Sequence, residues 1–203
     1  MDDLNNKKLV YVVCCVDTEG PLSESIQATF ERLNSILEID LEPSLDNLKK
    51  IQNKELDLGG KEDHAARIFA PHLLDYKNTW EKLDEMLIKI MSNEFRSQLL
   101  DSLSGKWIFN WHCVDHVGYV ENPRCRDLGH HKIFDHYQKM ITNTNSVQDA
   151  IHWHFHPMSF YHQAHKCGTS FINSPQLHEV LCRKIIEKQW FPKVFRAGFH
   201  VER

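Results

Sequence analysis

Three histidines alternate along residues 152–157, whose sequence is His-Trp-His-Phe-His-Pro. In an extended chain every second side chain faces the same side, so His152, His154 and His156 share one face. His152 and His154 then lie about 6–7 Å apart and can chelate one ion. His152 and His156 would lie about 13 Å apart and can share an ion only if the chain curls. Neutral imidazole suits zinc, and two histidines with a carboxylate leave a position for water. The segment predicts a metal site; the alternative is a histidine-rich polar face on an edge strand.

Two carboxylates stand close together near the N-terminus, in the segment Asp17-Thr18-Glu19-Gly20-Pro21. At the end of an extended strand Asp17 and Glu19 point the same way, about 6–7 Å apart. One of them can hold a metal ion while the other stays free as a base. The alternative interpretation is an ordinary strand-to-loop turn, in which Asp, Gly and Pro are common.

Three further polar residues are candidates for the same site. Arg196 lies between aromatic and apolar neighbours and needs an acidic partner if it is buried. We expect Asp17 to be that partner, and an ion pair elsewhere is the alternative. Asp115 follows an apolar segment and is a candidate to support the metal site or bind substrate. Arg124, in a polar loop, is a candidate contact for an anionic or hydroxylated substrate, although a solvated loop explains it equally well.

Four short apolar segments predict the strands that would position these side chains. They are residues 9–16, 107–114, 150–155 and 193–199. The first is uninterrupted and rich in β-branched residues, which is typical of a strand buried on both faces in a parallel sheet. Amphipathic patterns predict helices between the strands. These helices span residues 23–38, residues 72–103 with a break near Ser92-Asn93, and residues 175–189.

Strands that alternate with helices imply βαβ units and a parallel α/β fold. We therefore expect a single domain, residues 1–203, in which residues 22–104 form a mostly helical elaboration after the first strand. In such folds ligands bind beyond the carboxyl ends of the strands. The carboxylates, the histidines and the arginine described above follow three of the four strands, so we expect them to meet at one site.

Composition excludes several classes of protein. With 24 Lys and Arg against 28 Asp and Glu, the net charge of −4 leaves no electrostatic footprint for nucleic acid. The apolar run at residues 9–16 is too short to span a bilayer, which takes about 20 residues, and no cleavage site follows it. Six cysteines without a C-x-x-C pair favour a reducing compartment. We expect a cytoplasmic protein with no membrane span, and the 14 histidines point to metal or proton-transfer chemistry.

Three motifs, taken in order, resemble those of a known family. Asp-Thr-Glu-Gly-Pro at residues 17–21, His-x-x-x-His-Pro at 152–157 and Phe-Arg-Ala-Gly at 195–198 resemble the polysaccharide deacetylase superfamily, also called the NodB homology family. The resemblance implies a distorted (β/α) barrel of parallel strands. It also implies a divalent metal and hydrolysis of an acetamide C–N bond; the histidines favour zinc as that metal.

The residue roles follow from the same resemblance. Asp17 matches the catalytic base, and Arg196 matches the arginine that orients the base. An acid and two histidines match the metal ligands: Glu19, His152 and His156, with His154 as the alternative histidine.

The sequence also departs from the family pattern. Thr18 separates the two acids, and Glu19 stands where the family has aspartate. The later motifs, including the leucine–x–histidine segment that supplies the general acid, have no counterpart. Either the sequence is the N-terminal part of a longer protein or the site is incomplete, and in both cases we expect the barrel to be partial. The resemblance covers most of residues 9–21 and 106–203.

These observations predict a deacetylase-like hydrolase that acts on an amino sugar or a related carbohydrate. The alternative is a non-catalytic carbohydrate-binding or scaffold relative that keeps the fold. A metal phosphoesterase is a third hypothesis, but it would need more basic residues around the site than the sequence places there.

Overall fold

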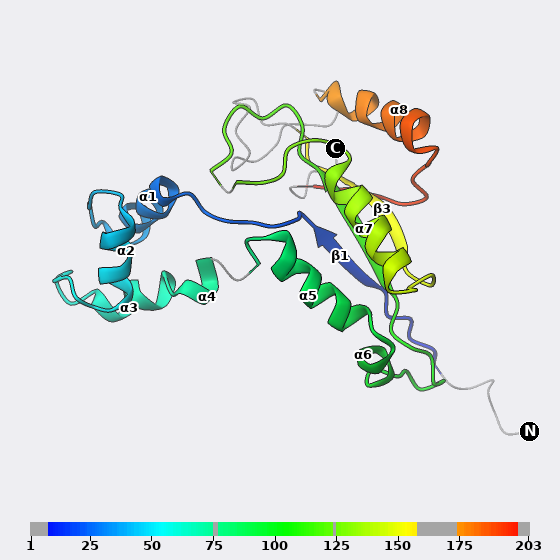
Figure 1. Ribbon diagram of the computed structural model, residues 1–203, viewed down its shortest axis with the longest axis horizontal. Helices are drawn as coiled ribbons and strands as arrows, with labels where there is room; N and C mark the ends of the chain where they lie inside the picture. The colour runs from blue at the N-terminus through cyan, green and yellow to red at the C-terminus, as the bar shows by residue number, and fades with distance from the viewer. Residues whose placement is uncertain (1–7, 75–76, 124, 158–173, 199–203) are drawn as a thin grey trace, which may run out of the picture.

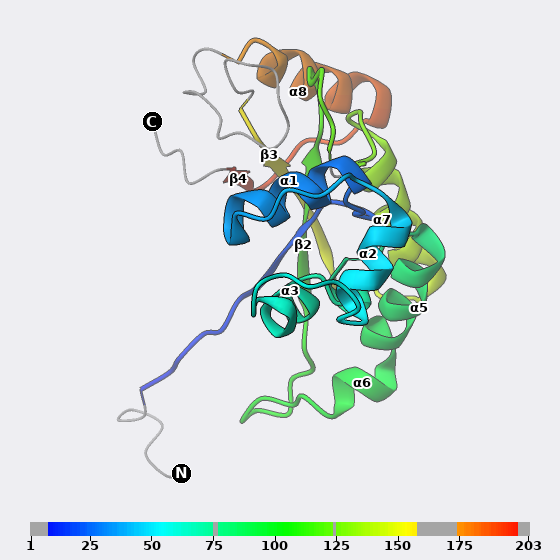
Figure 2. The same cartoon turned by 90° about the vertical axis from the view of Figure 1, so that its left-hand side faces the viewer.

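The computed structural model describes residues 8–74, 77–123, 125–157 and 174–198. Its centre is a curled, all-parallel sheet (Figures 1 and 2). The four strands follow one another in space as in sequence: β1 (Cys14–Thr18), β2 (Phe109–Asp115), β3 (Ala150–Phe155) and β4 (Phe195–Ala197). The parallel α/β prediction is confirmed, and the sheet forms a half-barrel. The described residues do not close it into the complete barrel that the resemblance implies.

Helices cover the convex face of the sheet (Figure 2). They are α5 (Trp80–Met91), α6 (Asn93–Ser97), α7 (Lys132–Asn143) and α8 (Gln176–Lys188). Leu87 of α5 and Tyr137 of α7 pack with Trp111 of β2 in the main hydrophobic core. Val180 of α8 packs with Trp153 of β3 in a smaller core. Because side chains alternate along a strand, the odd-numbered residues of β2 and β3 face the helices and the even-numbered residues line the concave face.

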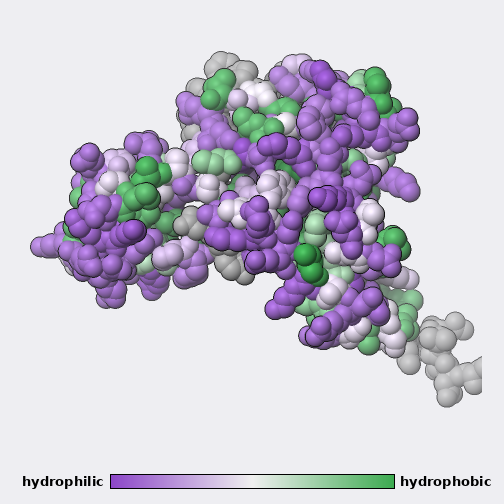
Figure 3. Space-filling model, viewed as in Figure 1, coloured by the Kyte–Doolittle hydropathy of each residue, from purple (hydrophilic) through white to green (hydrophobic). Residues whose placement is uncertain are grey.

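A separate helical lobe lies beside the sheet (Figure 1). It consists of α1 (Ile26–Leu37), α2 (Leu45–Gln52), α3 (Glu62–Ile68) and α4 (Pro71–Leu74). The lobe has its own hydrophobic core, which includes Phe30, Leu33, Ile51 and Phe69. The face of the lobe that Figure 3 shows is mostly hydrophilic, with a small hydrophobic patch. The predicted helical elaboration, residues 22–104, therefore divides, because α5 and α6 belong to the layer that covers the sheet.

The first strand is shorter than predicted. β1 begins at Cys14, and the apolar residues 9–13 are exposed and extend away from the sheet (Figure 2). The reason is the length of the neighbouring strand, since β2 begins at Phe109, which pairs with Cys14. Residues 9–13 therefore have no strand partner in the described sheet. The prediction of a strand buried on both faces is wrong, because Cys15 and Asp17 are exposed on the concave side.

Other boundaries agree more closely with the sequence. β3 covers the predicted residues 150–155, and α8 covers nearly all of residues 175–189. The predicted break near Ser92-Asn93 is confirmed, because the Ser92 hydroxyl accepts a hydrogen bond from the Phe95 amide and starts α6. No helix in the described ranges is long and apolar enough to cross a membrane.

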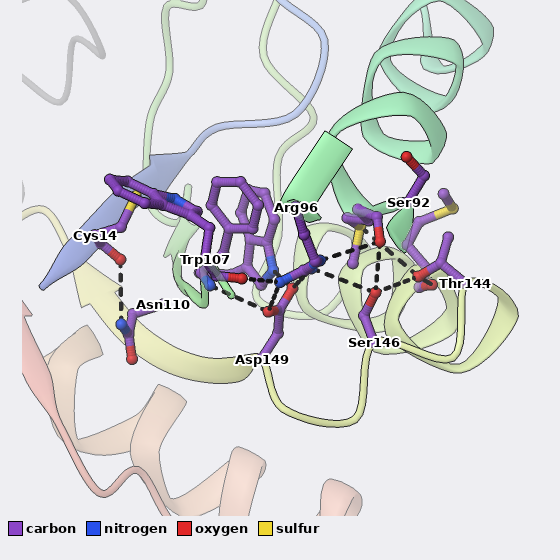
Figure 4. Close-up of polar contacts among 12 residues, drawn as sticks. Cys14, Ser92, Arg96, Trp107, Asn110, Thr144, Ser146 and Asp149 are labelled. Atoms are coloured by element: carbon purple, nitrogen blue, oxygen red, sulfur yellow. Dashed lines mark hydrogen bonds and ion pairs between the residues drawn. The ribbon is translucent and has the colours of Figure 1, made fainter. Parts of the chain in front are cut away.

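A buried ion pair joins α6 to the amino ends of the strands (Figure 4). The guanidinium of Arg96 donates to both carboxylate oxygens of Asp149 at 2.7 and 2.8 Å, and both side chains are fully buried. The same carboxylate accepts hydrogen bonds from the Phe109 amide and the Trp111 indole. Arg96 also donates to the carbonyl of Trp107. The bidentate ion pair and the additional hydrogen bonds to the same carboxylate fix β2 against the start of β3.

Candidate functional site

The register of the sheet aligns the candidate residues in rows on the concave face. Asp17 of β1 pairs with His112 of β2, which pairs in turn with His152 of β3. In the next row His154 of β3 pairs with Arg196 of β4. Residues in register on neighbouring parallel strands, about 4.8 Å apart, face the same side of the sheet. The expectation that these segments meet at one edge is therefore met for Asp17, Arg196 and the histidines.

Asp17 and Arg196 form an ion pair. The Nε atom of Arg196 donates to Oδ1 of Asp17 at 2.8 Å, and the two side chains are 44% and 36% exposed, respectively. This is the partner that the sequence predicted for the arginine. Because solvent screens a half-exposed pair, the contact adds only about 0–1 kcal/mol to stability. Its main effect is to hold the carboxylate in a fixed orientation at the edge of the site.

His154 and His156 lie side by side. Their Nε2 atoms are 2.8 Å apart and their ring centroids 4.6 Å apart. The Nδ1 atom of His154 donates to the backbone carbonyl of Arg196 at 3.0 Å, so Nε2 carries the lone pair when the ring is neutral. Burial lowers the pKa of His154, and burial together with the charge on His154 lowers the pKa of His156 to about 3. Both rings are therefore neutral at pH 7, as metal ligands must be.

His152 lies deeper on the same face and does not join that pair. Its Nε2 atom is 2.9 Å from Oδ1 of Asn110, and its ring centroid lies 5.0 Å from that of His112, with the two rings tilted by 42°. His112 is 3% exposed, and neither of its ring nitrogens has a hydrogen-bond partner. The chain does curl after β3, but the curl brings His156 to His154 and not to His152. The alternative ligand His154 thus replaces His152 beside His156.

Glu19 is bound to an arginine that sequence reasoning did not assign to the site. The Nε atom of Arg126 donates to Oε2 of Glu19 at 2.9 Å, and the arginine side chain is largely buried. Burial raises the pKa of Glu19, but Arg126 and the nearby His116 and His156 lower it by a larger amount. The pKa of Glu19 is therefore below its ordinary value. The side-chain amide of Asn122 positions the arginine, because it donates to the backbone carbonyl of Arg126 and accepts from its backbone amide. Glu19 is therefore close to the histidines but engaged with a cation.

His116 is a second residue that the sequence analysis did not assign to the site. It follows β2, where its backbone pairs with Gly129, and its side chain is 1% exposed. Its Nε2 atom has no hydrogen-bond partner. Burial and the charge of Arg126 lower the pKa of His116 to about 4, although Glu19 opposes this shift. The ring centroid lies 6.5 Å from that of His156.

The candidate Asp115 is not available to a substrate. It is 2% exposed, and its carboxylate pairs with Lys184 of α8 at 3.0 Å and accepts a hydrogen bond from the Trp153 indole. Burial raises its pKa to about 6, against the opposing effect of Lys184. The alternation of β2 explains the error, because an odd-numbered residue faces the helices. The other low-ranked candidate, Arg124, lies outside the described residues.

Gly198, the last residue of the Phe-Arg-Ala-Gly motif, packs directly on His156. A Cβ atom at this position would overlap the His156 ring. The Gly198 amide also donates to the carbonyl of Phe155 at 2.9 Å, which extends the β3–β4 pairing by one residue. The glycine therefore provides the space in which His156 turns back onto His154.

The side chains near the histidine pair only partly suit the metal that the resemblance implies. The ligand set implied by the resemblance does not assemble, since Glu19 binds Arg126 and His152 binds Asn110. In the described part of the chain no three His, Cys, Asp or Glu side chains lie close enough to hold an ion as they stand. His154 and His156 nevertheless present two neutral imidazole nitrogens side by side, which suits zinc. The described residues therefore offer two nitrogen ligands to a metal ion.

Comparison with known proteins adds no relative. No family model, no curated protein and no solved structure matches this chain.

Proposed function

We propose that this protein is a metal-dependent hydrolase of deacetylase type, which cleaves the acetamide C–N bond of an amino sugar or a related carbohydrate. One observation carries the proposal. The Asp17–Arg196 ion pair stands at the same edge of the half-barrel as the neutral His154–His156 pair, and the Arg196 carbonyl itself holds His154. A carboxylate base beside a pair of imidazole ligands is the arrangement that such hydrolysis requires.

Asp17 is the base in this proposal. Arg196 binds its Oδ1 atom, so Oδ2 is the oxygen left to accept a proton from water. Proton transfer to a positioned carboxylate contributes typically about 10²- to 10⁴-fold in rate. Arg196 is a positioning residue, because it orients the carboxylate without contacting the reacting atoms.

His154 and His156 would hold the divalent metal. A bound ion polarises the amide carbonyl and lowers the pKa of water. The protein's own contribution is to keep both imidazoles neutral by burial and to orient His154 through a backbone carbonyl.

A non-catalytic carbohydrate-binding relative is the second candidate. It is favoured by the Glu19–Arg126 ion pair, because an acid that is neutralised by an arginine is a poorer ligand for a metal. In that case the fold and the polar concave face would remain while hydrolysis is lost.

Release of acetate from N-acetylglucosamine and its oligomers, measured with and without added Zn²⁺, distinguishes the two candidates. We expect zinc-dependent release by the parent chain and none by Asp17→Asn, with zinc binding retained in the variant. Asp46→Asn, at an exposed surface ion pair on α2, is the matched control and should keep the parent rate. An Asp17→Asn variant that releases acetate at the parent rate removes Asp17 as the base. Sugar binding without acetate release would favour the second candidate.

A further inference from the structure

The Nε2 atom of His116 is a buried polar atom with no partner. The side chain is 1% exposed, and no described group accepts a hydrogen bond from this nitrogen or donates one to it. A buried polar atom without a partner costs free energy, so proteins seldom leave one. A ligand that binds there would satisfy it.

The other side of the ring is already engaged. A hydrogen bond joins the His116 ring to the backbone of Glu19, and because Nε2 is unpartnered this bond belongs to Nδ1. His154 is held in the same way, with its Nδ1 atom donating to the Arg196 carbonyl. In both residues the backbone fixes the tautomer so that Nε2 carries the lone pair, which faces Nε2 of His156 in His154 and has no partner in His116. Histidines that ligate metals are generally oriented by such a bond from the second nitrogen.

His116 also lies near the His154–His156 pair. The centroids of His154 and His156 are 4.6 Å apart, and those of His116 and His156 are 6.5 Å apart. Two imidazoles that bind one tetrahedral zinc through Nε2 have centroids about 5 Å apart. The first pair already has this spacing, and the third ring needs to approach by about 1–2 Å. This gap explains why no three side chains in the described residues form a ready site.

We infer that His116 is the third ligand of a three-histidine metal site, in which the Nε2 atoms of His116, His154 and His156 bind one zinc ion. This inference rests on the proposed function only for the presence of a metal. It differs from the ligand set implied by the resemblance, with which it shares His156 and the alternative histidine His154. Three histidines leave a fourth tetrahedral position for water, as in catalytic zinc sites. Glu19 then remains with Arg126 and supplies the negative charge beside the site.

Calorimetric titration of the full chain with Zn²⁺ tests the ligand set. We expect His116→Gln, His154→Gln and His156→Gln each to weaken zinc binding by about 100-fold or more. The asparagine amide nitrogen corresponds to Nδ1 of histidine, so His116→Asn, which can keep the hydrogen bond to Glu19 but offers no imidazole nitrogen, should lose zinc binding as His116→Gln does. His112→Gln is the matched control, because His112, on β2, is likewise a buried histidine with unpartnered ring nitrogens. It should bind zinc within about threefold of the parent, as should His152→Gln.

X-ray absorption at the zinc edge of the unaltered protein avoids any effect of a substitution on folding. Three imidazoles in the first coordination sphere support the inference, whatever the result of the acetate assay. Two imidazoles and a carboxylate, with zinc binding lost in Glu19→Gln and His152→Gln but kept in His116→Gln, overturn the inference and leave the proposed function standing. Absence of zinc binding by the parent chain overturns the inference outright. Three imidazoles without acetate release would remove the proposed function alone.

Discussion

Two regions of the sheet differ in whether their buried polar side chains have hydrogen-bond partners. At the amino ends, Arg96 and Asp149 are fully buried, and the carboxylate accepts four hydrogen bonds (Figure 4). On the concave face, His112 and His152 in mid-sheet and His116 just after β2 are buried, and each has at least one ring nitrogen without a partner. They supply four of the five unpartnered buried side-chain atoms of the described residues. The amino end is built for stability, whereas the concave face keeps histidine nitrogens without protein partners, and among these Nε2 of His116 lies beside the His154–His156 pair.

The largest effect on stability should come from breaking the buried Arg96–Asp149 ion pair. Asp149→Ala leaves the buried Arg96 guanidinium without its partner and removes the acceptor for the Trp111 indole. Loss of one partner of a buried ion pair costs about 3–5 kcal/mol, so we expect a large fall in the free energy of unfolding measured by urea denaturation. Arg183→Ala removes exposed ion pairs on α8 and should barely change that free energy. Equal effects of the two substitutions would contradict the comparison.

The buried, unpartnered His112 should make the free energy of unfolding of the metal-free protein depend steeply on pH. Burial and the charge on His152 lower the pKa of His112 to about 4, whereas an unfolded histidine titrates near 6.5. Between these values the unfolded state binds the extra proton, so stability is present above pH 6.5 and is lost as the pH falls toward 4. The loss should reach about 2–3 kcal/mol for this group. Urea denaturation at pH 7 and pH 4 should give a smaller difference for His112→Gln than for the parent; an unchanged difference argues against a neutral, buried His112.

The packing of Gly198 on His156 gives a more local effect. Gly198→Ala forces the His156 ring away from His154, so we expect zinc affinity to fall about tenfold or more, a loss of the size seen when groups that orient metal ligands are changed. Gly60→Ala is the control. A side chain is unfavourable there too, because of the φ of +84°, but Gly60 lies in the helical lobe with open space around it and contacts no histidine. The control should lose some stability and no zinc affinity. Parallel losses in both variants would mean that Gly198 acts only on folding.

The smallest effect on stability should come from Arg196→Ala. The ion pair with Asp17 is half-exposed, so the free energy of unfolding should change by only about 0–1 kcal/mol. The rate of acetate release should fall much more, because the carboxylate loses the group that orients it. Arg196→Lys, which keeps the charge without the planar guanidinium, should recover part of the rate. A rate that follows stability in both variants would reduce Arg196 to a structural residue.

Periodicity and strand-end reasoning predicted much of this arrangement. The residues of β3 and the Asp17–Arg196 pairing follow from alternation and from the rule that parallel strands end together. The partner of Glu19 could not be predicted in this way, because Arg126 comes from an irregular loop in which no period sets its direction. Local patterns also missed the pairing of Asp115 with Lys184, since the two residues are joined only by the packing of α8 on β2 and β3.

The exposed residues 9–13 show a different limit of sequence reasoning. Their apolar, β-branched pattern predicts a strand as strongly as that of residues 14–18. Only the starting point of β2 decides which part of the run has a hydrogen-bonding partner. In the same way His116 carries no local signal, because its role depends on a carbonyl from the segment after β1 and on a ring from the segment after β3.

The zinc content of the purified chain tests the central claim most directly. After equilibrium dialysis against Zn²⁺ at pH 7 and removal of free metal, elemental analysis should find about one zinc per chain. The neutral His154–His156 pair and the unpartnered Nε2 atom of His116 are the nitrogens proposed to bind it. The same content should be found in Asp17→Asn, whose side chain is the proposed base and not a ligand. A chain that retains no zinc under these conditions would contradict the account of the carboxyl end as a metal site.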